Sequence, residues 1–269
     1  MLKGEKGNPI GTRRFGWSEP LSRREFVLRS AAGAAAVALG CSDPPAPKRE
    51  PAVLGWRPHP PTSELPPGLR RLNIGSGRDG FIYVPPTYEH GTPAPLLVLL
   101  HGAGQDSTEW SDGPLAELVD DLGIIVLGPD SRLQTWDVAM TGQLGIDTPF
   151  IDRALEWTFD QCNIDPARIG LGGFSDGASC ALSLGITNGN LFSAVIGFSP
   201  GFVHADAQVG SPRVFISHGN ADNVLPVQNP LTIVSTLRSE DVVVTYEEFV
   251  GGHTVTREIA RQAFEWFVS

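Results

Sequence analysis

The chain has 269 residues, of which 41% are hydrophobic and 19% are charged, and its formal net charge at pH 7 is −10. This balance is that of a globular protein and excludes wholesale disorder, and no apolar run reaches the ~18 residues of a transmembrane helix. The acidic charge argues against sequence-independent binding of nucleic acid, and three cysteines are too few for a fold held together by disulfides.

Residues 1–40 have a basic and then apolar pattern that is typical of a targeting signal and not of a fold. Arg23 and Arg24 precede an alanine-rich run that ends just before Cys41. The segment resembles a bacterial twin-arginine export signal, and its end resembles a lipoprotein cleavage box, although Ala38 stands where that box usually has leucine. We therefore expect an exported periplasmic or cell-envelope lipoprotein of a bacterium, lipidated at Cys41. A plain cleavable signal is the alternative.

Residues 41–68 are expected to form a proline-rich tether. Nine of the 23 prolines lie between Asp43 and Pro67. Proline fixes φ and removes a backbone donor, so this stretch should have little regular structure. It would hold the domain formed by residues 69–269 away from a membrane surface, and that domain is long enough to bury one core.

Residues 69–269 alternate short apolar runs with helical patterns. Thr148 and Pro149 should begin one helix, and an apolar stripe over 255–267 predicts another. The predicted strands are Arg71–Ile74, Gly80–Val84, Leu96–Leu100, Gly123–Leu127, Ile169–Leu171, Ala194–Phe198, Val214–Ser217 and Val242–Phe249. Strands that alternate with helices predict an α/β fold, with a mostly parallel sheet covered by helices on both faces. Ligands of such sheets bind at the carboxyl ends of the strands.

A serine lies at one of these strand ends, in the sequence Gly173-Phe174-Ser175-Asp176-Gly177. The motif follows a predicted strand and opens a helical stretch, which is the context of a nucleophile elbow. The glycines allow a sharp turn, and the helix N-terminus favours a developing negative charge. The pattern predicts Ser175 as a nucleophile.

Two further strand ends supply the partners that a nucleophilic serine needs. His253 follows the last predicted strand and could take the proton of Ser175. Asp222 follows the strand at 214–217 and could orient the imidazole. The chain order of Ser175, Asp222 and His253 is that of the α/β-hydrolases.

The sequence from about Leu72 to the C-terminus resembles the α/β-hydrolase superfamily, and within it the phospholipase/carboxylesterase and polyhydroxybutyrate-depolymerase-like esterases. The motifs that carry the resemblance are His101–Gly104, Asp130–Arg132, Thr135–Asp137, Asp165–Ile169, Gly173–Gly177, His218–Asp222, Leu225-Pro226 and Gly252-His253. The resemblance implies an α/β-hydrolase fold and an oxyanion hole formed by the backbone N–H groups of Ala103 and Asp176. The short segment from Gly201 to Pro212 leaves no room for a large lid.

The expected function is that of a serine esterase, which hydrolyses small carboxylic esters through an acyl-enzyme on Ser175. It should need no cofactor and no metal, and it should contact a membrane only through Cys41. A lysophospholipase or lipase and a polyester (polyhydroxyalkanoate oligomer) depolymerase remain alternatives. A serine peptidase of the same fold and a non-catalytic binding module are less favoured.

Some side chains near these motifs allow more than one interpretation. Trp136 is expected to line the acyl or alcohol pocket, with simple packing as the alternative. His101 and His218 are expected to be structural, and Cys162 and Cys180 to be separate buried side chains. Without a lid, the site should be shallow and should prefer short acyl chains.

Overall fold

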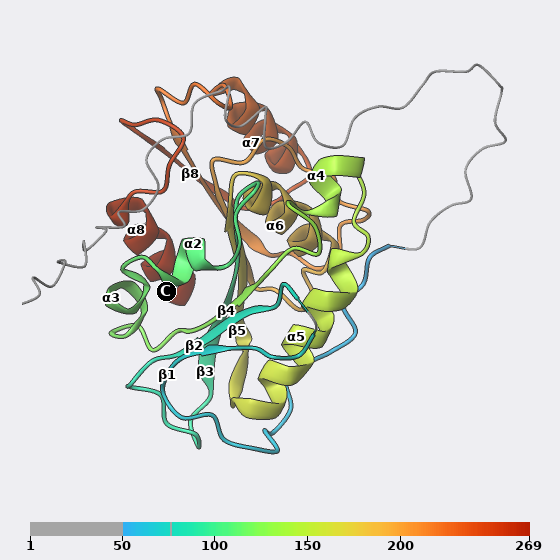
Figure 1. Ribbon diagram of the computed structural model, residues 1–269. Helices are drawn as coiled ribbons and strands as arrows, with labels where there is room; N and C mark the ends of the chain where they lie inside the picture. The colour runs from blue at the N-terminus through green and yellow to red at the C-terminus, as the bar shows by residue number, and fades with distance from the viewer. Residues whose placement is uncertain (1–50, 76) are drawn as a thin grey trace, which may run out of the picture.

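The computed structural model describes residues 51–75 and 77–269, which form one sheet covered by helices (Figure 1). The predicted export signal and Cys41 lie outside the described residues. Within the described part, no helix is long and apolar enough to cross a bilayer. The strands are β1 (Gly68–Arg71), β2 (Gly80–Val84), β3 (Ala94–Leu100), β4 (Ile125–Pro129), β5 (Ile164–Phe174), β6 (Ala194–Phe198), β7 (Arg213–Gly219) and β8 (Val244–Phe249).

The strand order in the sheet is β1-β2-β4-β3-β5-β6-β7-β8. The pairs β1–β2 and β2–β4 are antiparallel, and the other five pairs are parallel. The expectation of a mostly parallel sheet is therefore confirmed. Because β3 to β8 run in the same direction, the loops that follow them meet at one edge of the sheet.

Helices cover both faces of the sheet, as expected. They are α2 (Thr108–Ser111), α3 (Leu115–Val119), α4 (Asp137–Thr141), α5 (Asp147–Gln161), α6 (Asp176–Thr187), α7 (Gln228–Ser239) and α8 (Arg257–Val268). Side chains of α5, α6 and α7 share one apolar cluster with Leu96, Val98 and Leu100 of β3. Side chains of α2, α3 and α8 share the other with Leu97 and Leu99 (Figure 1). The twofold alternation along a strand therefore divides β3 between two cores.

The segment that follows β6 runs along α6 and forms no lid. Three hydroxyl groups of α6, spaced four residues apart, accept hydrogen bonds from backbone N–H groups of this segment. The pairs are Ser179 with Gly201 (3.0 Å), Ser183 with His204 (2.9 Å) and Thr187 with Asp206 (3.1 Å). These bonds hold the segment against the helix, and no large lid is present among the described residues, as the sequence predicts.

Several strands differ from their predicted bounds, most of all β5, which spans Ile164–Phe174 where the sequence predicts Ile169–Leu171. The first strand ends at Arg71 and does not extend to Ile74, because Asn73 has a φ of 53° and turns the chain out of the extended conformation. The last strand, predicted over Val242–Phe249, is β8 and begins at Val244. It lies at the edge of the sheet, and its side chains are half-buried or exposed.

Residues 51–67 have no helix or strand, yet they pack against the domain. The Leu54 side chain is completely buried, and its N–H donates to Asn188 Oδ1 over 2.8 Å. Asn188 Nδ2 donates in turn to the carbonyl oxygen of Ala52, and the N–H of Gly55 donates to Asp152. The packed body therefore begins N-terminal to Leu69, and the described part of the expected tether lies against it.

Candidate active site

Ser175 occupies a strained turn between β5 and α6. Its φ is 55° and its ψ is −118°, a region that side chains other than glycine rarely adopt. Two backbone hydrogen bonds hold it there. The N–H of Ser175 donates to the carbonyl oxygen of Phe198 over 2.9 Å, and its carbonyl oxygen accepts from Ser179 N–H over 3.0 Å. The strand–turn–helix arrangement predicted for Ser175 is therefore present.

The two glycines of the motif are required by close backbone packing. A Cβ atom at Gly177 would lie 2.4 Å from the carbonyl oxygens of Leu100 and His101. A Cβ atom at Gly173 would lie 2.4 Å from the carbonyl oxygen of Gly177. Only glycine lets β5 and α6 approach each other and β3 this closely.

His253 lies between Ser175 and Asp222. Its Nε2 is 2.9 Å from Ser175 Oγ, and its Nδ1 is 2.7 Å from Asp222 Oδ2. An ionised carboxylate only accepts hydrogen bonds, so Nδ1 carries the proton and the Nε2 lone pair faces the serine hydroxyl. The structure thus brings together the three residues that the sequence selected from the ends of β5, β7 and β8.

The serine and the histidine lie deeper than a shallow site would place them. Ser175 is 2% exposed and His253 is 1% exposed. The Phe174 ring contributes to this burial, because its centroid lies 4.8 Å from that of the His253 ring. The expectation of a shallow site therefore needs correction, since the hydroxyl is recessed among the loops at the sheet edge.

Asp222 is held by backbone donors as well as by His253. The N–H groups of Val224 and Leu225 donate to its Oδ1 over 2.9 and 2.8 Å. Burial acts to raise the pKa of Asp222, but the hydrogen bond and charge of His253, with the two N–H groups, leave that pKa below its ordinary value. His218 Nε2 lies 2.9 Å from the carbonyl oxygen of Leu225 and 3.3 Å from Asp222 Oδ2, so it packs beneath the carboxylate.

The loop after β3 packs against the turn that carries Ser175, since a Cβ atom at Gly177 would lie 2.4 Å from the carbonyl oxygen of His101. The Gly102 N–H donates to Glu109 Oε2 over 2.7 Å, and the Gly104 N–H donates to the carbonyl oxygen of Gln134 over 2.8 Å. Between them, the Ala103 N–H has no acceptor among the described residues, and neither has that of Asp176. These two N–H groups were the expected oxyanion donors. The supports from Glu109 and Gln134 were not expected from the sequence.

His101 braces this loop, as expected. Its Nε2 accepts from the Ser131 N–H over 3.0 Å, and its Nδ1 donates to the carbonyl oxygen of Gly102 over 2.8 Å. Burial lowers the pKa of His101 to about 4, so the ring is neutral and has one fixed tautomer. Arg78, which the sequence did not single out, donates to the carbonyl oxygen of Ser131 over 3.0 Å.

Trp136 does not line a pocket, which corrects its expected role in substrate binding. The side chain is completely buried, and its Nε1–H donates to the carbonyl oxygen of His101 over 2.8 Å. A ring without exposed surface cannot contact a substrate in this conformation. The neighbouring Thr135 donates its hydroxyl proton to Asp176 Oδ2 over 2.7 Å, and burial raises the pKa of that carboxyl group.

The two cysteines that the sequence placed near the motifs are packed in the interior of the domain. Cys162 and Cys180 are both buried and are not joined by a disulfide. Burial raises the pKa of the Cys162 thiol to about 12. In the part of the chain that the structure describes, no group of three or more histidine, cysteine or acidic side chains is arranged to hold a metal ion.

Residues 148–261 match the model of the phospholipase/carboxylesterase family. Acetylxylan esterase A of Emericella nidulans is 30% identical over 125 residues, which are 44% of this chain and 41% of that protein. A bifunctional acetylxylan esterase/xylanase of Neocallimastix patriciarum is 30% identical over 158 residues, which are 57% of this chain and 23% of that protein. The chain thus spans less than half the length of these curated relatives.

Solved structures of esterases and other hydrolases share the fold. An S-formylglutathione hydrolase of Staphylococcus aureus superimposes with a TM-score of 0.63 and 16% identity, covering 77% of this chain and 99% of that one. An acetyl xylan esterase from Aspergillus awamori gives a TM-score of 0.56 and 17% identity, covering 74% of this chain and 98% of that one. At these identities the likeness establishes the α/β-hydrolase fold alone.

Proposed function

We propose that this chain, an α/β-hydrolase similar in sequence to known esterases, is a serine esterase that cleaves short-chain carboxylic esters. The observation that carries the proposal is the chain of contacts from Ser175 Oγ to His253 over 2.9 Å and from His253 to Asp222 over 2.7 Å. These are the distances at which a histidine can take a serine proton while a carboxylate orients it.

In the first half-reaction, Ser175 Oγ attacks the ester carbonyl carbon while its proton passes to His253 Nε2. Asp222 stabilises the imidazolium that forms, and the low pKa of this carboxyl group keeps it ionised. The N–H groups of Ala103 and Asp176 stabilise the negative oxygen of the tetrahedral intermediate. His253 then protonates the departing alcohol, which leaves an acyl group on Ser175.

In the second half-reaction, water replaces the alcohol. His253 takes a proton from this water as it attacks the acyl carbon, and the same two N–H groups stabilise the second intermediate. When the intermediate collapses, His253 returns the proton to Ser175 Oγ. The products are one carboxylic acid and one free enzyme, and no cofactor takes part.

The acyl group is proposed to be short. Ser175 and His253 are almost completely buried, so little room is exposed around the nucleophile. An additional methylene group contributes ~0.8 kcal/mol only where a groove can bury it. The similarity to acetylxylan esterases is in keeping with an acetyl ester of a sugar hydroxyl group. A lysophospholipase, a lipase and a polyester depolymerase, all with long or polymeric acyl parts, are the competing substrate assignments.

A series of p-nitrophenyl esters from acetate to palmitate, kept below the micelle concentration, tests this proposal. We expect kcat/KM to peak at short chains and kcat to fall by about 10⁶ in Ser175→Ala. Asp222→Asn should lose about 10⁴, because the histidine loses its orienting carboxylate. A peak at long chains, or a rise in rate on emulsified substrate, would favour a lipase. Retained activity in Ser175→Ala would refute the assignment of the nucleophile.

We also propose that the protein is exported and anchored through a lipid on Cys41. The support is the sequence alone, namely the paired Arg23 and Arg24, the alanine-rich run and the position of Cys41 after it. An anchored esterase would meet its substrates at the cell envelope.

A further inference from the structure

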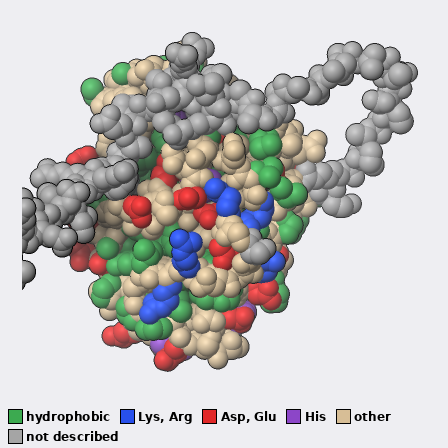
Figure 2. Space-filling model, viewed as in Figure 1, with side chains coloured by type: hydrophobic (Ala, Val, Ile, Leu, Met, Phe, Trp, Pro, Cys, Tyr) green, Lys and Arg blue, Asp and Glu red, His purple; other side chains and the backbone are tan. Residues whose placement is uncertain are grey.

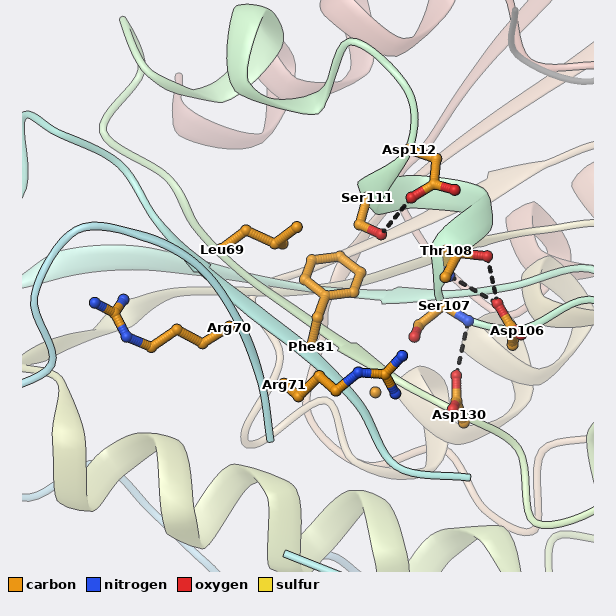
Figure 3. Close-up of a pocket in the computed structure, with 11 residues that line it drawn as sticks. Leu69, Arg70, Arg71, Phe81, Asp106, Ser107, Thr108, Ser111, Asp112 and Asp130 are labelled. Carbon is orange, nitrogen blue, oxygen red and sulfur yellow. Dashed lines mark hydrogen bonds between the residues drawn. The ribbon is translucent and has the colours of Figure 1, made fainter. Parts of the chain in front are cut away.

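A cavity lies at the same edge of the sheet as Ser175 (Figure 3). Its volume is about 300 Å³, and its walls come from β1, β2 and the region of α2. Because Arg71 pairs with Phe81, and Gly80 with Pro129, these residues lie at the end of the sheet from which β4 leads into its loop. The cavity therefore lies at the edge of the sheet that carries the loops of Ser175, Asp222 and His253.

The polar groups of this cavity come mainly from hydroxyl and carboxylate side chains. Ser107, Thr108 and Ser111 supply hydroxyl groups, and Asp112 supplies an exposed carboxylate. Leu69, which is 51% exposed, gives an apolar surface beside them. In Figure 3, Leu69, Ser107 and Ser111 border the space between the strands and α2, and the Thr108 hydroxyl donates to Asp106.

Arg71 is the cationic group of this space. Its side chain is exposed and forms neither a hydrogen bond nor an ion pair with another described residue. In Figure 3 it extends along the floor of the cavity toward Ser107 and Asp130. Arg70 extends the other way and donates to the carbonyl oxygens of Pro66 and Pro67. Arg71 is therefore available to donate hydrogen bonds to a ligand.

The charges of the lining argue against an anionic ligand. Three aspartates line the cavity, and of its two arginines only Arg71 extends into it. Figure 2 shows acidic and basic side chains interspersed on this face, without a patch of one sign. A ligand with many hydroxyl groups and no charge fits better, since carboxylates accept from hydroxyl groups and a guanidinium donates to them.

The cavity is close to the proposed oxyanion loop. Thr108 and Ser111 line the cavity from α2, while Glu109 of the same helical turn accepts a hydrogen bond from Gly102. One helix, with a diameter of about 10–12 Å including side chains, thus separates the two sites. A chain of a few sugar units could reach from one to the other.

We propose that this cavity binds a neutral sugar unit of the glycan whose ester is cleaved at Ser175. The inference rests on the proposed esterase function and extends it, since it assigns an acylated neutral glycan as the substrate class. Arg71 and Asp112 hold the sugar from opposite walls. The cavity contributes to the binding of the polymer and takes no part in the chemical step.

The test compares two substrates, acetylated xylan and p-nitrophenyl acetate, on the full-length protein. Arg71→Ala and Asp112→Ala should each raise KM for acetylated xylan about fivefold, the effect of losing one or two hydrogen bonds. Their kcat/KM for p-nitrophenyl acetate should equal that of the wild type, because this ester is too small to reach the cavity. Arg168→Ala is the matched control, since Arg168 pairs with Asp165 at the start of β5.

The outcomes separate this inference from the proposed function. If the wild type cleaves p-nitrophenyl acetate but both cavity variants match Arg168→Ala on acetylated xylan, the sugar site is refuted and the esterase stands. Cleavage of p-nitrophenyl acetate without any cleavage of acetylated xylan also refutes the sugar site. If the wild type cleaves neither substrate, the proposed function itself fails.

Discussion

The carboxylate of Glu109 accepts a hydrogen bond from the backbone N–H of Gly102 over 2.7 Å. Two residues further along, the N–H of Gly104 is fixed by Gln134. Both neighbours of Ala103 are therefore tied down, while the Ala103 N–H has no acceptor among the described residues. A donor held in this way needs no rearrangement when charge develops on a substrate oxygen, which is the requirement for an oxyanion hole.

Glu109→Ala should lower kcat about tenfold and leave KM nearly unchanged. The loss of one oxyanion donor costs about 10²–10³ in kcat, and a loosened donor should cost less. Glu109→Gln should recover part of the loss, because an amide oxygen can still accept from Gly102. Kinetics on p-nitrophenyl acetate measure both constants, and urea unfolding confirms that the variants fold. A change in KM alone would show that Glu109 does not act through Ala103.

Leu54→Ala should destabilise the protein by about 2–5 kcal/mol, although it lies outside the domain expected from the sequence. The side chain is completely buried, and removing its methyl groups leaves a cavity. Val53→Ala is the matched control, because Val53 is 58% exposed and should change the free energy of unfolding by less than about 0.5 kcal/mol. Urea unfolding measures both variants, and equal effects would mean that residues 51–57 do not pack on the body.

The sequence predicts that Ser175, Asp222 and His253 lie together, because all three follow the ends of parallel strands. Parallel strands carry their C-terminal loops to one edge, so Ser175, Asp222 and His253 could be placed together without knowing any contact. The supports from Glu109 and Gln134 could not be predicted in this way. They join segments whose separation depends on loop conformation, and no spacing in the sequence records it.

The role of Trp136 and the packing of residues 51–67 were predicted wrongly because both depend on contacts between residues far apart in the sequence. An aromatic ring in a loop after a strand is compatible with lining a pocket or with packing. For Trp136, the complete burial of the ring and its hydrogen bond to the carbonyl oxygen of His101 decide for packing. The proline-rich composition of residues 51–67 predicts the absence of helices and strands correctly. It carries no information on whether Leu54 finds an apolar surface and a partner such as Asn188.

Lowering the pH should reduce the free energy of unfolding more in the wild type than in the His101→Gln variant. The pKa of His101 falls from 6.5 to about 4 on folding, so the unfolded chain binds a proton that the folded protein does not. Stability therefore decreases as the pH falls from 6.5 to 4, by about 3 kcal/mol for a shift of this size.

The measurement for His101 is the free energy of unfolding at about pH 7 and about pH 4.5. Burial raises the pKa of Asp147 to about 6, which opposes the effect, but this carboxyl group is present in both proteins and cancels in the comparison. Equal losses in the wild type and in His101→Gln would show that His101 does not remain neutral in the folded protein.

Intact-mass analysis of the exported protein should find a polypeptide that begins at a lipidated Cys41. Replacing both Arg23 and Arg24 by lysine should block export, because the positive charge is kept while the paired arginines are lost. An N-terminus downstream of Cys41, or an unmodified thiol at Cys41, would contradict lipidation but would not contradict export. Export of the lysine variant would contradict the twin-arginine route.

The most direct test of the mechanism is to trap the acyl group. The protein is mixed with p-nitrophenyl acetate, quenched in acid within the first turnover, digested and analysed by mass spectrometry. We expect one acetyl group on the peptide that contains Ser175, and none on that peptide in Ser175→Ala. An acetyl group on another residue, or steady turnover without any acetylated peptide, would contradict an acyl-enzyme on Ser175.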